Sequence, residues 1–365
     1  MTSRWPAGVR RARDLVMEYG WNATSYQIVN PGIDHWFSER GDAVVGYVTH
    51  RSVRVVAGAP VSAAGRLSDV VDEFERASER AGERVCYFGA EARLESVLGT
   101  RGDHAMALLG AQPSWRPSSW VELPRTLSSL RAQLNRAANK GVRISEWPAA
   151  EAASSPELHS ILDRWLRGRG LPPLHFLVEP DTLTRLDDRR VFVAVRDDTE
   201  AGAPGNPIAF AVLSPIPARN GWLVEQFPRT PEAPNGTIEL LLHGAVTTIA
   251  REGCDYVTLG LAPLAGRDAA GSLPEPLWLR LMLRWVRAHG RRFYNFGGLE
   301  SFKAKFHPDS WEPVYAIEHS PQFTPRALYA IAGAFASSPP LRLAAVALRR
   351  AITQEVLGRS YALER

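Results

Sequence analysis

Short apolar segments alternate with amphipathic ones along the first third of the chain, and this alternation restricts the fold more than any other feature. Residues 67–81 carry apolar side chains at helical spacing, with acidic residues between them. The complete series predicts helices at 67–81 and 91–98 and strands at 26–29, 43–48, 52–56, 85–89 and 105–109. Strands and helices in this order predict an α/β unit built on a mixed sheet.

A second series of elements begins at Trp120. Thr126 is predicted to cap a helix that runs to Lys140. Beyond it, helices are predicted at 156–167, 237–253 and 277–288, and strands at 191–195, 208–214, 221–227 and 257–259. A chain of 365 residues is long enough for two domains of this kind.

Composition excludes some classes of protein. The two cysteines, Cys86 and Cys254, indicate neither a disulfide scaffold nor a metal site, so a reducing cytoplasm is the expected compartment. The nine histidines are scattered without the spacing of metal ligands, so no metal is expected. A net charge of +4 permits binding to nucleic acid or anionic lipid but is not diagnostic.

The segment 293–315 places Lys303 and Lys305 between aromatic residues, before a Trp-Glu-Pro turn. Positions two apart on a helix lie about 200° apart around its axis. Both lysines can therefore face one ligand only if the helix ends between them, which would make them candidates for holding an anionic group. The alternative is a solvated pair of lysines on a helix anchored by aromatic residues.

A turn followed by a helix is predicted at 234–243. Asn235-Gly236 is a turn signal, Thr237 is predicted to cap the helix, and Glu239 lies in its first turn. Glu239 can be a functional carboxylate or simply a charge favoured by the helix dipole. The apolar strand that follows ends near Gly260 and Pro263, where backbone can approach a ligand closely.

Four segments, read in order, carry a resemblance: 130–141, 234–237, 259–264 and 295–313. Residues 42–47 and 58–61 fit the same pattern. With these segments the chain resembles the catalytic domain of the bacterial phosphatidylglycerol aminoacyltransferases, the multiple peptide resistance factor family. The resemblance covers roughly residues 20–320.

The resemblance implies an α/β (α+β) fold with two tandem GNAT-like acyltransferase lobes, each a mixed, mostly antiparallel sheet flanked by helices. It suggests an N-terminal extension at 1–20, an N-terminal lobe at 21–119, a catalytic lobe at 120–320 and an apolar helical tail at 321–365. The implied reaction moves an amino acid from aminoacyl-tRNA to a hydroxyl, usually of phosphatidylglycerol. No nucleophile motif is present, which favours direct attack without a covalent enzyme intermediate.

Roles follow from the resemblance as expectations. Glu239, Asn235 and Lys305 are the expected catalytic residues, with no metal and no cofactor besides the aminoacyl-tRNA donor. Arg131, Arg136 and Lys140 form an expected phosphate-binding stripe for tRNA or a lipid headgroup, the alternative being an ordinary solvated helix face. The expected substrate-binding residues are Arg229, Gly236, Thr237, Gly260, Pro263, Asn295, Gly298, Lys303 and Trp311.

The membrane relationship is left open at this level. The longest apolar runs are well under the ~20 residues that span a bilayer, so the flippase part of the lipid-modifying family members is expected to be missing. The apolar helices of 324–357 either lie at a membrane surface or pack on the protein. The expected location is cytoplasmic, with a peripheral position on the inner face of the membrane as the lipid hypothesis requires. The alternatives are a soluble small-molecule or peptide acceptor and, less favoured, an acyl-CoA-dependent or non-catalytic protein.

Overall fold

The computed structural model describes residues 5–168, 174–197, 205–265, 276, 278–279 and 296–335. Within them, twelve strands form one mixed sheet in the order β1-β2-β3-β4-β12-β5-β10-β9-β8-β7-β6, and β11 pairs with β5 off this path. The strands are β1 Asp34–Phe37, β2 Val44–His50, β3 Val53–Ala57, β4 Arg84–Ala90, β5 Ala105–Trp115, β6 Val142–Trp147, β7 Arg190–Arg196, β8 Asn206–Ile216, β9 Gly221–Gln226, β10 Tyr256–Thr258, β11 Ala262–Pro263 and β12 Ser310–Glu318.

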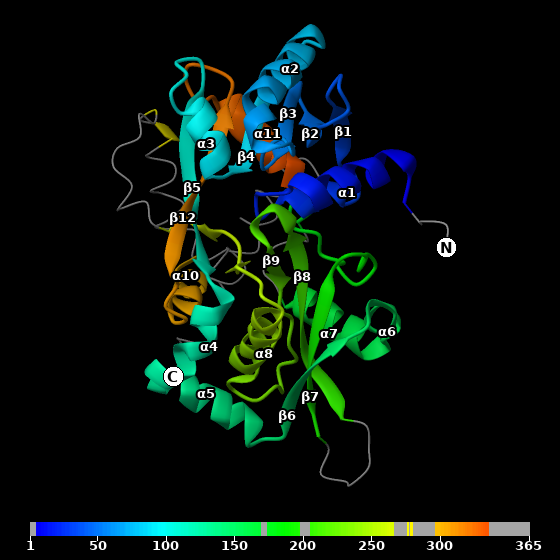
Figure 1. Cartoon of the computed structure of the whole chain (residues 1–365), viewed down its shortest axis with the longest axis vertical. Coiled ribbons are helices and arrows are strands. Elements are labelled where there is room, and N and C mark those ends of the chain that lie inside the picture. Colours follow the sequence, from blue (N-terminus) through cyan, green and yellow to red (C-terminus); the bar gives the residue numbers. More distant parts are fainter. Residues whose placement is uncertain are drawn as a thin grey trace, which may run out of the picture.

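Helices flank this sheet, and the long strands β5 and β12 connect its upper and lower parts in Figure 1. The α-helices are α1 Ala7–Tyr19, α2 Leu67–Arg80, α3 Ala92–Leu98, α4 Pro117–Thr126, α5 Ser128–Ala138, α6 Ala149–Ser154, α7 Pro156–Arg167, α8 Thr237–Arg251, α10 Phe296–Ala304 and α11 Pro325–Phe335. Short 3-10 helices are η1 Ser25–Val29, η2 Ala64–Arg66 and η3 Pro217–Arg219. The predicted α/β class with a mixed sheet is confirmed.

Each part of the sheet contains a parallel strand pair joined by a helix. β3 and β4 run parallel with α2 between them in the chain, and β9 and β10 run parallel with α8 between them. Parallel neighbours require such a crossover, usually helical. The two units resemble one another, as two lobes would. β12 lies between β4 and β5, however, so the lobe boundary at residues 119 and 120 stays a prediction.

Three local predictions are wrong. Residues 25–29 form η1 rather than a strand, because they hydrogen-bond to their own neighbours and are buried on all sides. Trp120 to Thr126 belongs to α4, and Thr126 does not cap α5, whose N-cap is Leu127. Strand β5 extends to Trp115, well past the predicted end at residue 109, because β12 pairs along it. For β5 the deciding contact is distant in sequence, whereas η1 and the start of α5 are set by neighbouring residues.

The described start of the C-terminal tail packs on the protein. α11 buries Ala327, Ala330 and Ile331 in a core shared with strands β2 and β3, and Tyr329 stacks on His50. The rest of the predicted apolar helices, 336–357, and most of the predicted helix at 277–288 lie outside the described residues. Among the described residues, no helix has the length and apolar character that crossing a membrane requires.

Candidate active site

The two lysines at the end of α10 have different partners. Lys303 is 3% exposed, and its Nζ donates to the carbonyl oxygens of Gly260 at 2.7 Å and Leu261 at 2.9 Å. Lys305 follows the helix end at Ala304 and forms an ion pair with Glu239. The prediction that both lysines hold one anion therefore needs correction. The helix does end between them, but Lys303 is buried against two carbonyl oxygens, whereas Lys305 is partly exposed and pairs with Glu239.

Aromatic rings support Lys305. Its Nζ lies 4.1 Å from the ring centroid of Phe302 and 5.3 Å from that of Phe306. Phe306 is fully buried and stacks on Trp120, and Trp115 Nε1 donates to the Phe306 carbonyl oxygen at 2.9 Å. Ring faces attract cations. The lysine therefore stands on a rigid platform while 38% of its side chain stays accessible to solvent.

Lys303 gives a pH-dependent prediction. Burial lowers its pKa to about 7, whereas the unfolded chain keeps the ordinary value of about 10.4. Between these values the unfolded chain binds more protons, so this residue makes stability increase with pH. We expect the unfolding free energy of the wild type, relative to Lys303→Met, to increase from about pH 7 to pH 10. Urea denaturation across this range measures it, and parallel pH curves for the two proteins would contradict it.

The start of α8 forms the other side of the site. Gly236 has φ +94°, and a Cβ there would collide with the carbonyl oxygen of Gln133 on α5. Thr237 is the first residue of α8 rather than its cap, because its Oγ1 donates to the Pro234 carbonyl oxygen at 2.7 Å. The Asn235-Gly236 turn is thus held tightly against α5, and the predicted capping role of Thr237 is wrong.

Gly236→Ala is expected to destabilise the protein by about 2 kcal/mol or more, since it adds a backbone clash to an unfavourable φ. Gly253→Ala is the matched control. Gly253 also has a positive φ, +79°, but a Cβ there meets nothing within 4 Å. Chemical denaturation of both variants isolates the clash with Gln133, and equal losses of stability would show that the close approach to α5 is unimportant.

The predicted site residues differ in their contacts and exposure. Two pairs of predicted residues are in direct contact: Lys303 with Gly260, and Lys305 with Glu239. Pro263 pairs with β5 through Gly110, and Trp311 lies on β12, half-buried. Gly298 lies within α10, and Asn295 lies outside the described residues. The exposed predicted residues are Arg131, Arg136, Lys140, Arg229 and Asn235.

Sequence reasoning missed a polar cluster around Arg219. Its guanidinium forms two hydrogen bonds with Glu312, at 2.6 and 2.9 Å, and lies 3.4 Å from the Tyr256 ring centroid. Burial raises the pKa of the neighbouring Glu91 to about 7. The sequence signal was the charged residue Glu312 in the Trp-Glu-Pro segment, which was predicted to be a turn but lies within strand β12. Its partner lies 93 positions away, which no local pattern reveals.

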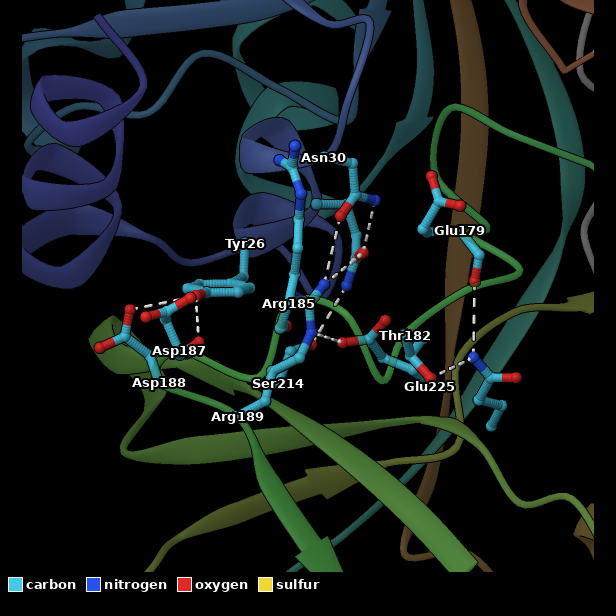
Figure 2. Close-up of polar contacts among 12 residues, drawn as sticks. Tyr26, Asn30, Glu179, Thr182, Arg185, Asp187, Asp188, Arg189, Ser214 and Glu225 are labelled. Carbon is cyan, nitrogen blue, oxygen red and sulfur yellow. Dashed lines mark hydrogen bonds and ion pairs between the residues drawn. The ribbon is translucent and has the colours of Figure 1, made fainter. Parts of the chain in front are cut away.

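A second buried network joins η1 to the sheet (Figure 2). Arg189 donates to Glu225 at 2.6 Å, and their side chains are 1% and 8% exposed. Arg189 also donates to Asn30 at 3.2 Å, and Gln27 donates to Ser214 at 3.1 Å. These bonds connect residues before 31 with residues after 188, so the network ties the N-terminal segment to β8 and β9.

A pocket of about 470 Å³ lies elsewhere. It is lined by Pro156, Glu157, Ser160, Ile161, Arg164, Arg196, Asn206, Pro207, Ile208, Thr230 and Glu232. None of the predicted site residues lines it, so its size alone does not locate the chemistry.

Comparison with known proteins decides the family. The family described as "Phosphatidylglycerol lysyltransferase, C-terminal" matches residues 13–318, most of the chain. The chain belongs to this family. The phosphatidylglycerol lysyltransferase of Bacillus subtilis is 24% identical over 313 residues, which cover 85% of this chain and 35% of that protein. The lysylphosphatidylglycerol biosynthesis bifunctional protein LysX of Mycobacterium sp. (strain JLS) is 24% identical over 300 residues, covering 80% and 26%.

Solved structures of the phosphatidylglycerol lysyltransferase type agree with the fold. The C-terminal domain of a putative lysylphosphatidylglycerol synthetase from Agrobacterium fabrum matches with a TM-score of 0.74 at 25% identity, covering 90% of this chain and 97% of that one. L-PGS from Bacillus licheniformis matches with a TM-score of 0.71 at 20% identity, covering 93% and 95%. The chain spans about a third or less of the length of the Bacillus subtilis and Mycobacterium relatives.

Proposed function

We propose that this chain is an aminoacyltransferase that moves an amino acid, lysine by analogy with its relatives, from aminoacyl-tRNA to a hydroxyl of phosphatidylglycerol. The observation that supports this most is the Lys305–Glu239 ion pair at the first turn of α8. A cation and an anion are held side by side there, and the substrates carry the matching groups. Phosphatidylglycerol has an anionic phosphate, and an aminoacyl ester has a cationic ammonium.

The ion pair suggests how each substrate group is bound. The Glu239 carboxylate occupies the position beside Lys305 that a phosphate would take, and the Lys305 ammonium occupies the position beside Glu239 that an amino group would take. Substrate binding would replace one internal ion pair with two pairs to ligands. Only part of the pair is exposed, 38% for Lys305 and 13% for Glu239, which strengthens such contacts over those in bulk water.

The transfer step needs little covalent help. The acceptor hydroxyl oxygen attacks the ester carbon, a new C–O bond forms, and the bond to the terminal ribose oxygen of the tRNA breaks. That ribose oxygen receives the proton that the acceptor hydroxyl loses. The ester is already activated, so positioning and charge stabilisation would supply most of the rate. The step balances without a redox cofactor, and we propose aminoacyl-tRNA as the only co-substrate.

Helix α5 is the proposed tRNA contact. Its side chains Arg131 and Arg136, and Lys140 just beyond it, are exposed. The helix touches the start of α8 through Gln133 and Gly236. Contacts of this type neutralise phosphates and weaken with salt. The proposed acceptor implies that the chain works at the cytoplasmic membrane surface. Helix α11, at the start of the tail, packs one face on the sheet.

The test is transfer of radiolabel from a mixed pool of charged tRNAs, with anionic vesicles and a small-molecule extract both present. We expect the label to enter the lipid phase, and splitting the tRNA pool would identify the amino acid. Label in the aqueous small-molecule fraction would contradict the lipid acceptor while keeping the donor. Label that stays on tRNA, while a known transferase in the same mixture is active, would overturn the proposed reaction.

A further inference from the structure

Three residues far apart in sequence meet beside the N-terminal core. Glu75 lies on α2, His104 immediately precedes β5, and His319 immediately follows β12. Each offers one ligand atom, and the three atoms lie within 4.8 Å of one another. The side chains of His104 and Glu75 are 0% and 6% exposed, and that of His319 is 21% exposed. The cluster is therefore shielded but still reachable from solvent through His319.

The separations suit a tetrahedral ion. His104 Nε2 lies 2.9 Å from Glu75 Oε1, and His319 Nδ1 lies 3.6 Å from Glu75 Oε2. Two ligands of tetrahedral zinc, each bound at about 2.0–2.2 Å, stand about 3.3–3.5 Å apart. The two observed separations, which are to different oxygens of Glu75, lie on either side of that value, and either oxygen could be the ligand. The imidazole rings are nearly parallel, 4.7 Å apart, so coordination requires the more exposed His319 ring to tilt towards the ion.

The surroundings hold the ligands as a metal site would. His104 Nδ1 lies 2.7 Å from Asp103 Oδ1, and its Nε2 lies 2.9 Å from Glu75 Oε1, where a bound metal ion would replace that hydrogen bond. A ligating histidine commonly uses its second nitrogen as Nδ1 is used here. The Tyr87 hydroxyl donates to Glu75 Oε1 at 2.9 Å and orients the carboxylate. All five residues, Glu75, Tyr87, Asp103, His104 and His319, thus form one connected network.

His319 is the part of this network that ordinary hydrogen bonds do not explain. The carboxylate oxygens of Glu75, Glu79 and Asp103 surround its ring at 3.6, 3.9 and 3.9 Å, beyond hydrogen-bond distance. A divalent cation would balance the surrounding carboxylates and would engage His319.

We propose that Glu75, His104 and His319 bind a zinc ion, with a water as the fourth ligand. The ion would link α2 and the start of β5 to the C-terminal end of β12. It would stabilise the N-terminal part of the sheet without taking part in the transfer. No local spacing predicts this site, because its ligands come from positions 75, 104 and 319.

The test uses the full chain, stripped with a chelator and then titrated with zinc against a chromophoric competitor. We expect about one equivalent of zinc to bind and the melting temperature to increase by about 3 °C or more at saturation. Replacement by cobalt is expected to give the visible absorption of a tetrahedral site with nitrogen and oxygen ligands.

Variants locate the ion. His319→Asn and His104→Ala are each expected to lower zinc affinity at least 10-fold. His159→Asn is the matched control, because His159 is half-buried on α7 and away from the cluster. His319→Asn is the safer variant for folding, since it changes the most exposed ligand. No zinc binding by the wild type, or binding unchanged in a folded His319→Asn variant, overturns the proposal.

Discussion

Replacing Lys305 with alanine is expected to lower kcat/KM for lipid aminoacylation by about 100- to 1,000-fold, the usual loss when one charge-stabilising donor is removed from an active site. Stability should change by less than about 1 kcal/mol, because the side chain is 38% exposed and solvent screens the ion pair. Lys305→Arg keeps the charge and should retain part of the activity. Label transfer and urea denaturation, measured on the same preparations, separate the two effects.

The control for this variant is Arg80→Ala, an exposed cation at the end of α2 and away from α8 and α10. It should leave both transfer and stability unchanged. Loss of stability in Lys305→Ala in proportion to its loss of activity would make Lys305 a structural residue. Full activity in Lys305→Ala would remove the Lys305–Glu239 pair from the proposed mechanism, even if label still reached the lipid.

Arg189→Met is expected to be the most destabilising of these substitutions, by about 3–5 kcal/mol. Arg189 is buried against Glu225, whose side chain is 8% exposed. Loss of Arg189 would leave that buried carboxylate without its cationic partner. Asn30 would lose a donor as well. Urea denaturation measures the unfolding free energy. Because the network joins η1 to the sheet (Figure 2), we also expect the region around η1 to lose protection from hydrogen exchange.

The double variant Arg189→Met/Glu225→Met tests the cause. Removing both charges eliminates the buried unpaired carboxylate, so the double variant should be more stable than Arg189→Met alone. If the double variant is no more stable, the loss comes from altered packing around Tyr26, whose ring centroid lies 4.8 Å from the Arg189 guanidinium. In that case the ion pair would not be what holds η1 to the sheet.

Much of the fold follows from local patterns. The predicted helix at 156–167 matches α7, and residues 67–81 match α2 to within one residue. Apolar periodicity and proline at the helix start act over a few residues, so a sequence reveals them. The strand at 26–29 failed because valine and isoleucine favour a strand only where a partner is available, and η1 has none.

The candidate site was also predictable only in part. The Asn235-Gly236 turn and the helix after it were readable from residue order, whereas a helix end between Lys303 and Lys305 was only a condition for a shared ligand. The interaction partners of the site residues were not readable from residue order. Lys303 could equally have faced solvent or an anion, and only the position of the Gly260 turn gave it two carbonyl acceptors. The Arg219–Glu312 pair and the Glu75–His104–His319 cluster were missed for the same reason.

By itself, the sequence determined many of the strands and helices and the family resemblance, because periodicity, turns and motifs are properties of neighbouring residues. Only the tertiary structure decided which charges meet. The Lys305–Glu239 pair spans 66 positions and the Arg189–Glu225 pair spans 36. Which side chains become partners depends on sheet order and on how helices lie across it. Sheet order and helix placement follow from burial of the apolar surface of the whole chain, and no short segment encodes them.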